Sequence, residues 1–342
     1  MFERIRIRAP FELHRDRLPL PQPIGADYLV RVDVCGLCRS DLHAAADWAR
    51  DWQEVGHEFG GTVVARGRWA TRFRVGERVA VRNAASCGEC ERCRGGQPRR
   101  CAQLVVNMQG FRDFALCDER SLVDARGLDD EALALVEPIN VALDLLHAAR
   151  LRPAHRVLVL GAGTLGLLTA FLGRQVWALK TMFVAGRAAA SPLAERLELP
   201  YVSFGEGVDA AAVRVALGGA ADRVLVTSPP STIGAALDCC RAGGRVLVAG
   251  LDDLARCAVA IDVSRLVFGQ QTLTGVCAAP NEHFEQAVEV LRTHAPALRG
   301  LIARRVSRDR LEEALQTWRD RAHFDGKTIL VNERNGREHA AA

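Results

Sequence analysis

Lysine is almost absent from this chain of 342 residues, because Lys180 and Lys327 are the only two and nearly all of the 45 basic residues are arginine. The arginines are spread along the whole chain, and they form neither a cluster nor a stripe. A nucleic-acid surface is usually such a cluster or stripe, so the net charge of +4 does not indicate a nucleic-acid partner.

Long hydrophobic runs are missing as well. The longest apolar stretch, residues 157–172, is interrupted by Gly161, Gly163 and Gly166 and is too short to span a bilayer. The first residues lack the apolar core and the cleavage site of a secretory signal. With a mean hydropathy of +0.02, the composition favours a soluble cytoplasmic protein without a membrane partner, and the length is sufficient for two domains.

The eleven cysteines are an odd number without a secretory context, which favours metal-bound and buried free thiols over disulfides. Four of them follow the pattern C-x2-C-x2-C-x7-C: Cys87, Cys90, Cys93 and Cys101. Thiolates at this spacing on a glycine-rich loop can converge on one zinc ion at about 2.3 Å. Four thiolates leave no open coordination position, so we expect a structural zinc in this cysteine lobe, residues 86–102. Five further cysteines are expected to be inert core residues: Cys117, Cys239, Cys240, Cys257 and Cys277.

Short β-rich runs dominate the chain between about residues 26 and 125, for example 28–34 and 61–66, and glycine and proline separate them. This pattern predicts mostly antiparallel strands. From about residue 155 to 277, buried strands alternate with Ala/Leu-rich helical stretches, which predicts a doubly wound parallel sheet. The expected strands are 156–160, 181–185, 221–226 and 244–249.

Helical patterns return beyond residue 280, at 282–293 and 310–319, and a strand at 327–331 follows them. The polar tail 332–342 is expected to be disordered.

A glycine motif follows the first strand of the parallel sheet. Gly161 permits a tight turn, Gly163 lets the backbone approach a pyrophosphate, and Gly166 lets the helix pack closely on the strand. Thr164 and Leu165 open the helix whose N-terminus would face the phosphates. Because the motif lies between a strand and a helix, it predicts a dinucleotide site rather than an ordinary glycine-rich turn.

The second strand of this sheet ends without the acidic residue that usually binds the ribose 2′-hydroxyl of NAD. Arg187 stands in that turn instead, where its guanidinium could bind a 2′-phosphate. The sequence therefore predicts that NADP is preferred over NAD. A solvated surface arginine is the alternative in so arginine-rich a chain.

Two nearby segments carry thiol, imidazole and carboxylate groups. The first contains Cys35 and Cys38, and the second contains His57 and Glu58. A catalytic zinc takes three protein ligands and keeps one position open for water or substrate. Glu137, which precedes a proline just before the nucleotide motif, is the candidate for the remaining ligand.

These motifs together resemble the zinc-containing medium-chain dehydrogenase/reductase (alcohol dehydrogenase-like) family, over nearly the whole chain. The resemblance rests on Cys-Arg-Ser-Asp-x-His at 38–43, Gly-His-Glu at 56–58, the cysteine lobe, Glu-Pro at 137 and the glycine motif. It implies an α/β protein with a GroES-like β-rich catalytic domain, residues 1–145 and 280–342, and a Rossmann coenzyme-binding domain, residues 146–279.

The resemblance also implies roles for single residues. Cys38 rather than Cys35 would bind the catalytic metal with His57, and either Glu58 or Glu137 would complete the ligands. Ser40 and His43 would form the proton relay that serves the substrate hydroxyl.

The expected activity is therefore zinc-dependent hydride transfer between a secondary alcohol and NADP, which yields a ketone. The polyol and sugar dehydrogenase branch points to a polyol, sugar or cyclitol. Two zinc ions per chain and a homodimer or homotetramer are expected, with residues 272–276 as a candidate edge strand for pairing.

Three alternatives differ in measurable ways. An NAD-dependent alcohol or amino-alcohol dehydrogenase would differ in cofactor or substrate. A non-catalytic regulatory protein would bind zinc and nucleotide without turnover. A nucleic-acid binder that uses the cysteine lobe would bind DNA in a salt-dependent way.

Overall fold

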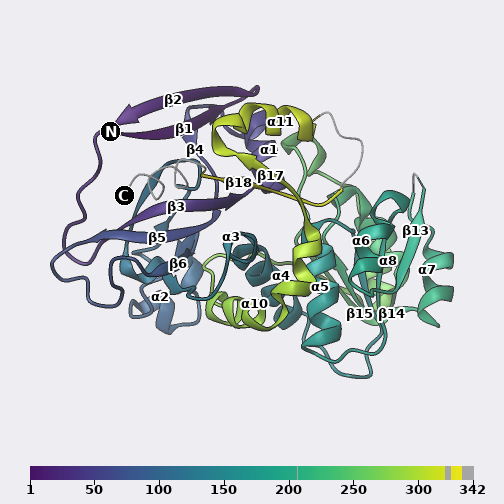
Figure 1. Ribbon diagram of the computed structural model, residues 1–342. Helices are drawn as coiled ribbons and strands as arrows, with labels where there is room; N and C mark the ends of the chain where they lie inside the picture. Colours follow the sequence, from purple (N-terminus) through teal and green to yellow (C-terminus); the bar gives the residue numbers. More distant parts are fainter. Residues whose placement is uncertain (206, 320–324, 333–342) are drawn as a thin grey trace. The chain divides into compact units, whose positions relative to one another are not determined.

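The computed structural model describes residues 1–205, 207–319 and 325–332, and it divides into two compact units (Figure 1). One unit consists of Met1–Asn140 together with the elements from α10 (Phe284–Leu298) to β18 (Lys327–Val331). The other consists of Val141–Ala278. The predicted disordered tail lies outside the described residues except for Asn332. No helix in the described ranges is long and apolar enough to cross a membrane.

The first unit is built on a seven-stranded sheet with the order β10-β6-β5-β3-β18-β17, to which β9 adds by pairing with β3. All of its pairs are antiparallel except β17 with β18, so the expectation of mostly antiparallel strands is confirmed. The strands are β3 (Tyr28–Gly36), β5 (Glu58–Arg66), β6 (Arg78–Val81), β9 (Phe114–Cys117), β10 (Leu122–Asp124), β17 (Ile302–Ser307) and β18.

A hairpin of β1 (Phe2–Arg8) and β2 (Glu12–Leu18) forms a second sheet with β4 (Gln53–Glu54). Alternating side chains of β1 face the core, where Ile5 and Ile7 are buried, while its arginines stay partly exposed. Helix α3 (Asp130–Leu133) packs on β3 and β5, and α11 (Leu311–Arg319) packs on β17. Side chains of β1, of the seven-stranded sheet and of α11 form one apolar core.

The second unit contains a six-stranded, wholly parallel sheet, as the alternating pattern predicts. Its order is β13-β12-β11-β14-β15-β16, so the chain winds outward twice from β11, first through β12 and then through β14. The strands are β11 (Val157–Leu160), β12 (Met182–Arg187), β13 (Tyr201–Phe204), β14 (Ala221–Val226), β15 (Cys240–Val248) and β16 (Thr272–Gly275).

Helices connect these parallel strands (Figure 1). They are α5 (Thr164–Gln175), α6 (Ser191–Arg196), α7 (Ala210–Leu217), α8 (Ile233–Cys239) and α9 (Val263–Gly269), and α4 (Val136–Ala148) precedes the first parallel strand, β11. The reversal of winding lies between β11 and β14. In open parallel sheets, ligands bind at the carboxyl ends of the strands at such a reversal.

The cysteines expected in the core are only partly there. Cys117, Cys239 and Cys240 are buried, whereas Cys257 is half-buried. Cys277 is exposed, so the prediction for it was wrong. It follows β16, which is the edge strand of its sheet in the part of the chain that the structure describes.

Candidate functional site

Two neighbouring strands carry the predicted metal ligands of the first unit. Residue Gly36 at the end of β3 pairs with Glu58 at the start of β5, so the segments just outside this pair lie side by side. Cys38 follows β3 as the N-cap of α1 (Arg39–His43), and His57 directly precedes β5. As a result, donor atoms of Cys38, His57 and Glu58 all lie within 4.8 Å of one another. The spacing and the thiolate, imidazole and carboxylate chemistry fit a transition-metal ion such as zinc.

Asp41 ties the two ligand-bearing segments together. Its Oδ2 accepts a hydrogen bond from the Cys38 backbone N–H at 2.9 Å, and its Oδ1 accepts one from the Gly56 N–H at 3.3 Å. The same Oδ1 lies 3.6 Å from Nδ1 of His57, which is an ion-pair distance rather than a hydrogen bond. Because Asp41 lies on the Nδ1 side of the ring, Nε2 is the nitrogen suited to a metal.

The electrostatics of the site reflect its burial. Burial alone would lower the pKa of His57, but the Cys38 thiolate and the Asp41 carboxylate raise it well above its usual range. Burial raises the pKa of Glu137 to about 7, although the nearby His57 opposes this shift. The carboxylates of Asp41 and Glu137 and the thiolate of Cys38 repel one another when all are charged. A bound cation would relieve that repulsion.

Glu137 lies at the start of α4 and is 7% exposed, but it does not belong to the group of three mutually close donors. Its Oε1 accepts a long hydrogen bond of 3.5 Å from Nδ2 of Asn83. Glu137 is close enough to His57 and Glu58 to interact with them electrostatically. It therefore remains a candidate ligand that would have to move toward the ion.

The sequence reasoning did not identify Lys327, whose Nζ forms an ion pair with Oε2 of Glu58. The side chains are only 4% and 3% exposed, respectively. The contact is an ion pair rather than a well-formed hydrogen bond. Composition alone could have drawn attention to Lys327, because lysine is rare in a chain whose basic residues are nearly all arginine.

The predicted relay residues follow Cys38 on the same short helix. Ser40 is half-buried, and His43 is 5% exposed. The imidazole of His43 stacks on Trp48 with ring centroids 5.2 Å apart, and Trp48 in turn packs against the apolar core. The other nearby tryptophan in the sequence, Trp52, does not stack on His43 but lies against His14.

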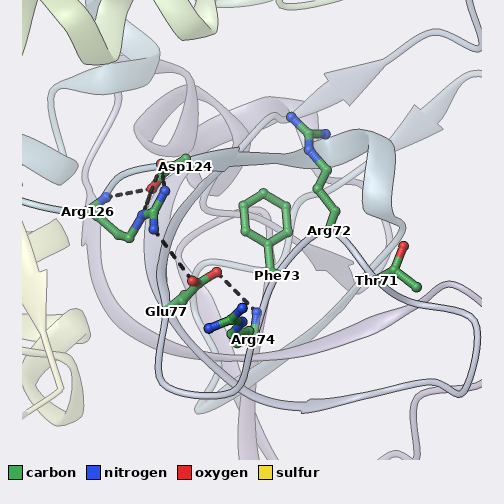
Figure 2. A pocket seen from close by; sticks show the side chains of 7 residues that line it. All are labelled: Thr71, Arg72, Phe73, Arg74, Glu77, Asp124 and Arg126. Atoms are coloured by element: carbon green, nitrogen blue, oxygen red, sulfur yellow. Dashed lines mark hydrogen bonds and ion pairs between the residues drawn. The ribbon is translucent and has the colours of Figure 1, made fainter.

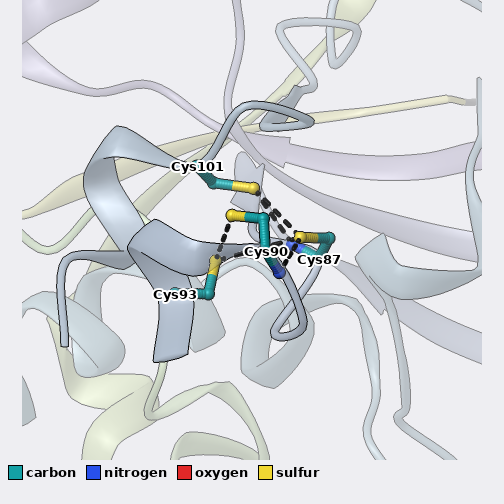
Figure 3. Close-up of side chains that lie close together, drawn as sticks. All are labelled: Cys87, Cys90, Cys93 and Cys101. Atoms are coloured by element: carbon teal, nitrogen blue, oxygen red, sulfur yellow. Dashed lines mark hydrogen bonds between the residues drawn. The ribbon is translucent and has the colours of Figure 1, made fainter. Parts of the chain in front are cut away.

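The four cysteines of the lobe converge on one point (Figure 3). The sulfur atoms of Cys90 and Cys93 are 3.5 Å apart, those of Cys87 and Cys101 also 3.5 Å, and those of Cys87 and Cys93 3.9 Å. A tetrahedron with zinc–sulfur bonds of about 2.3 Å has sulfur atoms about 3.8 Å apart. The geometry therefore fits a four-cysteine structural zinc cluster.

Backbone N–H groups point at these sulfur atoms, as expected for thiolates. The Cys87 and Gln103 N–H groups each donate to Sγ of Cys101 at 3.3 Å, and the Cys90 N–H donates to Sγ of Cys87 at 3.4 Å. The lobe has little regular structure of its own. Its elements are β7 (Ala84–Ala85), α2 (Glu91–Arg94), the 3-10 turn η2 (Pro98–Arg100) and β8 (Val105–Val106).

The glycine motif forms the turn between β11 and α5 in the second unit. Gly161 has a φ of +118°, and a Cβ there would lie 2.6 Å from the Ser228 nitrogen. Gly163 is the N-cap of α5, so Thr164 and Leu165 form its first turn, and space around Gly163 is open. A Cβ on Gly166 would lie 1.8 Å from the Gly161 carbonyl oxygen. Gly161 thus forms the predicted tight turn and Gly166 the predicted close contact of helix and strand, whereas the approach of a pyrophosphate to Gly163 stays a prediction.

Arg187 is the last residue of β12 and is exposed. Its carbonyl oxygen accepts a hydrogen bond of 2.6 Å from the Tyr201 hydroxyl. The preceding Gly186 is tightly enclosed, because a Cβ there would lie 2.5 Å from both Cβ of Ala162 and the Tyr201 hydroxyl oxygen.

Two surface cavities of the first unit contain none of the predicted site residues. One is lined by polar loops, and Figure 2 shows Arg126 paired there with Asp124 and Glu77. The other lies beside β17 and α11 and is lined by Arg304, Arg305 and Trp318 among others.

Comparisons with known proteins agree with this arrangement. Residues 25–127 match the alcohol dehydrogenase GroES-like domain, which confirms the fold expected for this part of the chain. The chain is 30% identical over 336 residues to an L-threonine 3-dehydrogenase of Saccharopolyspora erythraea, which covers 93% of this chain and 95% of the relative. It is 28% identical to the L-galactonate-5-dehydrogenase of Escherichia coli, over 71% of this chain and 74% of the relative.

A solved structure is also similar over nearly its whole length. The rspB alcohol dehydrogenase of Escherichia coli, complexed with NADH, superimposes with a TM-score of 0.84 at 21% identity. The match covers 96% of this chain and 99% of that one.

Proposed function

Because the chain belongs to the zinc-containing medium-chain dehydrogenase/reductase family, we propose that it transfers a hydride between a secondary alcohol and NADP, which yields a ketone. The substrate class is a polyol, sugar or cyclitol. The similarity to a dehydrogenase of L-galactonate supports a polyhydroxylated substrate. Residues 1–145 and 280–342 would form the catalytic domain, and residues 146–279 would bind the coenzyme.

The observation that carries this proposal is the convergence of Cys38, His57 and Glu58 within 4.8 Å. Cys38 and His57, with either Glu58 or Glu137 as the third ligand, would hold a zinc ion that acts as a Lewis acid on the substrate oxygen. Ser40 would accept the proton that the alcohol loses and pass it toward His43, which acts as general base. The nicotinamide would take a hydride from the carbinol carbon, so with the hydroxyl proton passed to Ser40 the alcohol would lose two electrons and two protons in all.

Zinc content and turnover test the proposal together. We expect two zinc ions per chain and reduction of NADP by some members of a panel of secondary alcohols. Cys38→Ser should lose one zinc ion and all turnover. Cys35→Ser is the matched control, because its sulfur is outside the ligand group, and it should keep both ions. A Cys38→Ser protein that keeps two zinc ions and its turnover would contradict the proposed site.

The preference for NADP is supported by the surroundings of Gly186 and Arg187. A carboxylate side chain at Gly186 would collide with Ala162 and Tyr201, so an NAD-type acidic residue does not fit at that position. A charged hydrogen bond from Arg187 to a 2′-phosphate would contribute about 1.5–3 kcal/mol.

Replacing Arg187 measures that contribution. Arg187→Ala should lower kcat/KM for NADP by roughly 10- to 100-fold and leave that for NAD unchanged. Arg214→Ala is the control, because that side chain is exposed and, among the residues that the structure describes, donates a hydrogen bond to the carbonyl one turn earlier, at Ala210. An equal loss with both cofactors, or a wild-type preference for NAD, would refute the role.

A homodimer or homotetramer is proposed to form at the edge of the parallel sheet. Strand β16 is the last strand, and beside it α9 exposes Val263, Val267 and Phe268, the last of which is 87% exposed. Phe268→Asp should then shift light scattering toward a smaller species. Val215→Asp, at an equally exposed apolar position on α7, should not. A monomeric wild-type protein would refute the assembly.

A second candidate is oxidation of an amino alcohol, favoured by the similarity to an L-threonine 3-dehydrogenase. Including L-threonine with NAD and with NADP in the substrate panel distinguishes the two. Turnover of L-threonine above that of every polyol would favour this second candidate.

A further inference from the structure

His43 is the last residue of α1 and is only 5% exposed. Helix α1 has five residues, which is little more than one turn, and a helix of this length is not stable by itself. In the proposed function His43 is the general base, and such a group has to stay within hydrogen-bond reach of its proton donor. Other parts of the chain therefore have to hold the imidazole in place.

The chain continues from α1 into a π-helical turn, η1 (Ala44–Trp48). The Ala49 N–H donates a hydrogen bond of 3.0 Å to the first carbonyl of this turn, five residues earlier, whereas an α-helix uses the carbonyl four residues earlier. In an α-helix the side chain of Asp47, four residues on, would lie over His43. The wider turn instead brings Trp48, five residues on, over the imidazole. Turns of this kind are rare and often lie at functional sites.

The contact between the two rings is a stack. The ring centroids of His43 and Trp48 are 5.2 Å apart, and the angle between the ring planes is 26°. This distance lies in the range that aromatic pairs prefer. The Trp48 Nε1–H is buried and has no hydrogen-bond partner in the part of the chain that the structure describes. The face of the indole, rather than its N–H group, therefore makes the contact.

Trp48 is held in turn by the rest of the first unit. Its side chain is half-buried and packs against the apolar core. The connection between β1 and β2 fixes the backbone of the turn on another side. There the Phe11 N–H donates a hydrogen bond to the Ala45 carbonyl at 2.7 Å. The Ala9 N–H donates a second one to the Ala49 carbonyl, also at 2.7 Å. The hairpin and the core thus fix the indole, and the indole covers one face of the imidazole.

We propose that Trp48 is a positioning residue that holds the His43 imidazole in the orientation in which it accepts the proton from Ser40. The inference rests on the proposed function, because it takes His43 as the general base. Trp48 acts through the imidazole and not on the reacting atoms. Its contribution should therefore appear in the turnover number, kcat, rather than in the binding of substrate.

Steady-state kinetics of the full-length, zinc-loaded protein test this role, with NADP and the secondary alcohol that the wild type oxidises fastest. Trp48→Leu should lower kcat by about 10- to 100-fold, because a displacement of about 1 Å can cost a catalytic group that much. It should leave KM unchanged. Trp48→Phe keeps an aromatic face over the imidazole and should retain most of kcat. Trp52→Leu is the matched control, because that tryptophan of the same segment lies against His14, and it should keep kcat.

Two further measurements connect the effect to His43. In a His43→Ala background, Trp48→Leu should cause no further loss of kcat, because the group that it positions is already absent. NMR of histidines labelled with 13C at Cε1 reports the stack without turnover. The His43 signal, which is the one missing from His43→Ala, should be shifted upfield by the indole ring current in the wild type and in Trp48→Phe. It should move downfield in Trp48→Leu and stay in place in Trp52→Leu.

The inference is overturned if Trp48→Leu keeps its kcat, if its loss of kcat persists without His43, or if the His43 signal does not move. A raised KM with unchanged kcat would also overturn it, because that result is expected of a side chain that contacts substrate. Failure of the proposed function has a separate signature. In that case the wild-type protein oxidises no alcohol of the panel, or His43→Ala keeps the wild-type kcat, although the NMR signal still reports the stack.

Discussion

In the turn between β11 and α5, we expect opposite effects of alanine substitution at two glycines that are only three residues apart. A methyl group on Gly166 would lie 1.8 Å from the Gly161 carbonyl oxygen and 2.7 Å from Oγ1 of Thr227. A methyl group on Gly163 would meet no atom within 4 Å, and its backbone φ of −78° suits any residue. Alanine at position 166 should therefore disturb the fold, whereas alanine at position 163 should disturb only what binds there.

The loss of stability in Gly166→Ala can be estimated from the group that the new methyl would meet. The Gly161 carbonyl belongs to the backbone and cannot rotate away, so helix α5 has to move from β11. Overpacking of this kind costs about 1–3 kcal/mol, and we expect the upper end for Gly166→Ala. At about 2–4 °C per kcal/mol, the melting temperature should fall by roughly 6–12 °C.

Gly163→Ala should change stability by less than about 0.5 kcal/mol, as is usual for substitutions in open space. It should nevertheless weaken nucleotide binding, because a pyrophosphate has to approach the backbone at this residue. Thermal melting and a titration with NADP, both on the zinc-loaded protein, separate the two effects. The reasoning is refuted if Gly166→Ala melts like wild type, or if Gly163→Ala binds NADP with unchanged affinity.

Three further predictions concern the lobe, the metal site and the parallel sheet. Cys90→Ser should lose the lobe zinc, whereas Cys257→Ser should keep it; equal zinc contents would contradict the lobe assignment. Asp41→Asn should weaken metal binding by about 10- to 100-fold in a chelator competition, since it loses its charge beside His57; unchanged affinity would argue against this role. Burial alone would raise the pKa of Asp222, but the Arg241 guanidinium and a backbone N–H lower it below its usual range. Because the Arg241 side chain is 45% exposed, the pair should contribute less than about 1 kcal/mol; this should be present above about pH 4 and disappear as the pH falls through the lower folded-state pKa. Asp222→Asn should remove that pH dependence from urea unfolding curves, and an unaltered acid limb would contradict it.

The parts of the fold that could be predicted are those in which local sequence determines structure. The buried strands at 156–160 and 221–226 and the glycine turn at 161 carry their signal within a few residues. The cysteine lobe is similar, because its four ligands lie between residues 87 and 101 and their spacing alone brings them together.

The hairpin of β1 and β2 was not predicted, although β1 alternates buried and partly exposed residues. Its arginines obscured the alternation, because several of them are neutralised by acidic side chains such as Asp16. In the sequence alone, half-buried arginines that are paired with acids are indistinguishable from the arginines of a solvent-exposed segment. Charged residues therefore hide a strand from sequence analysis when their charges are balanced by a neighbouring strand.

The Glu58–Lys327 pair was beyond local reasoning for a different reason. The two residues are brought together only because β3 accepts β5 on one edge and β18 on the other. Sequence patterns predict that a strand exists at 327–331 but not which strand it joins or in which register. A one-residue shift of β18 would turn Lys327 to the opposite face of the sheet.

The two metal sites of this chain consequently depend on the fold in opposite ways. The lobe has little regular structure, so its four thiolates need an ion to define their positions, and binding and ordering are coupled. The catalytic ligands are presented by the ladder between β3 and β5, and Asp41 and Lys327 hold their surroundings without an ion. A site whose geometry is fixed by the sheet can leave one coordination position unused. That open position is what catalysis requires and what a four-cysteine site cannot provide.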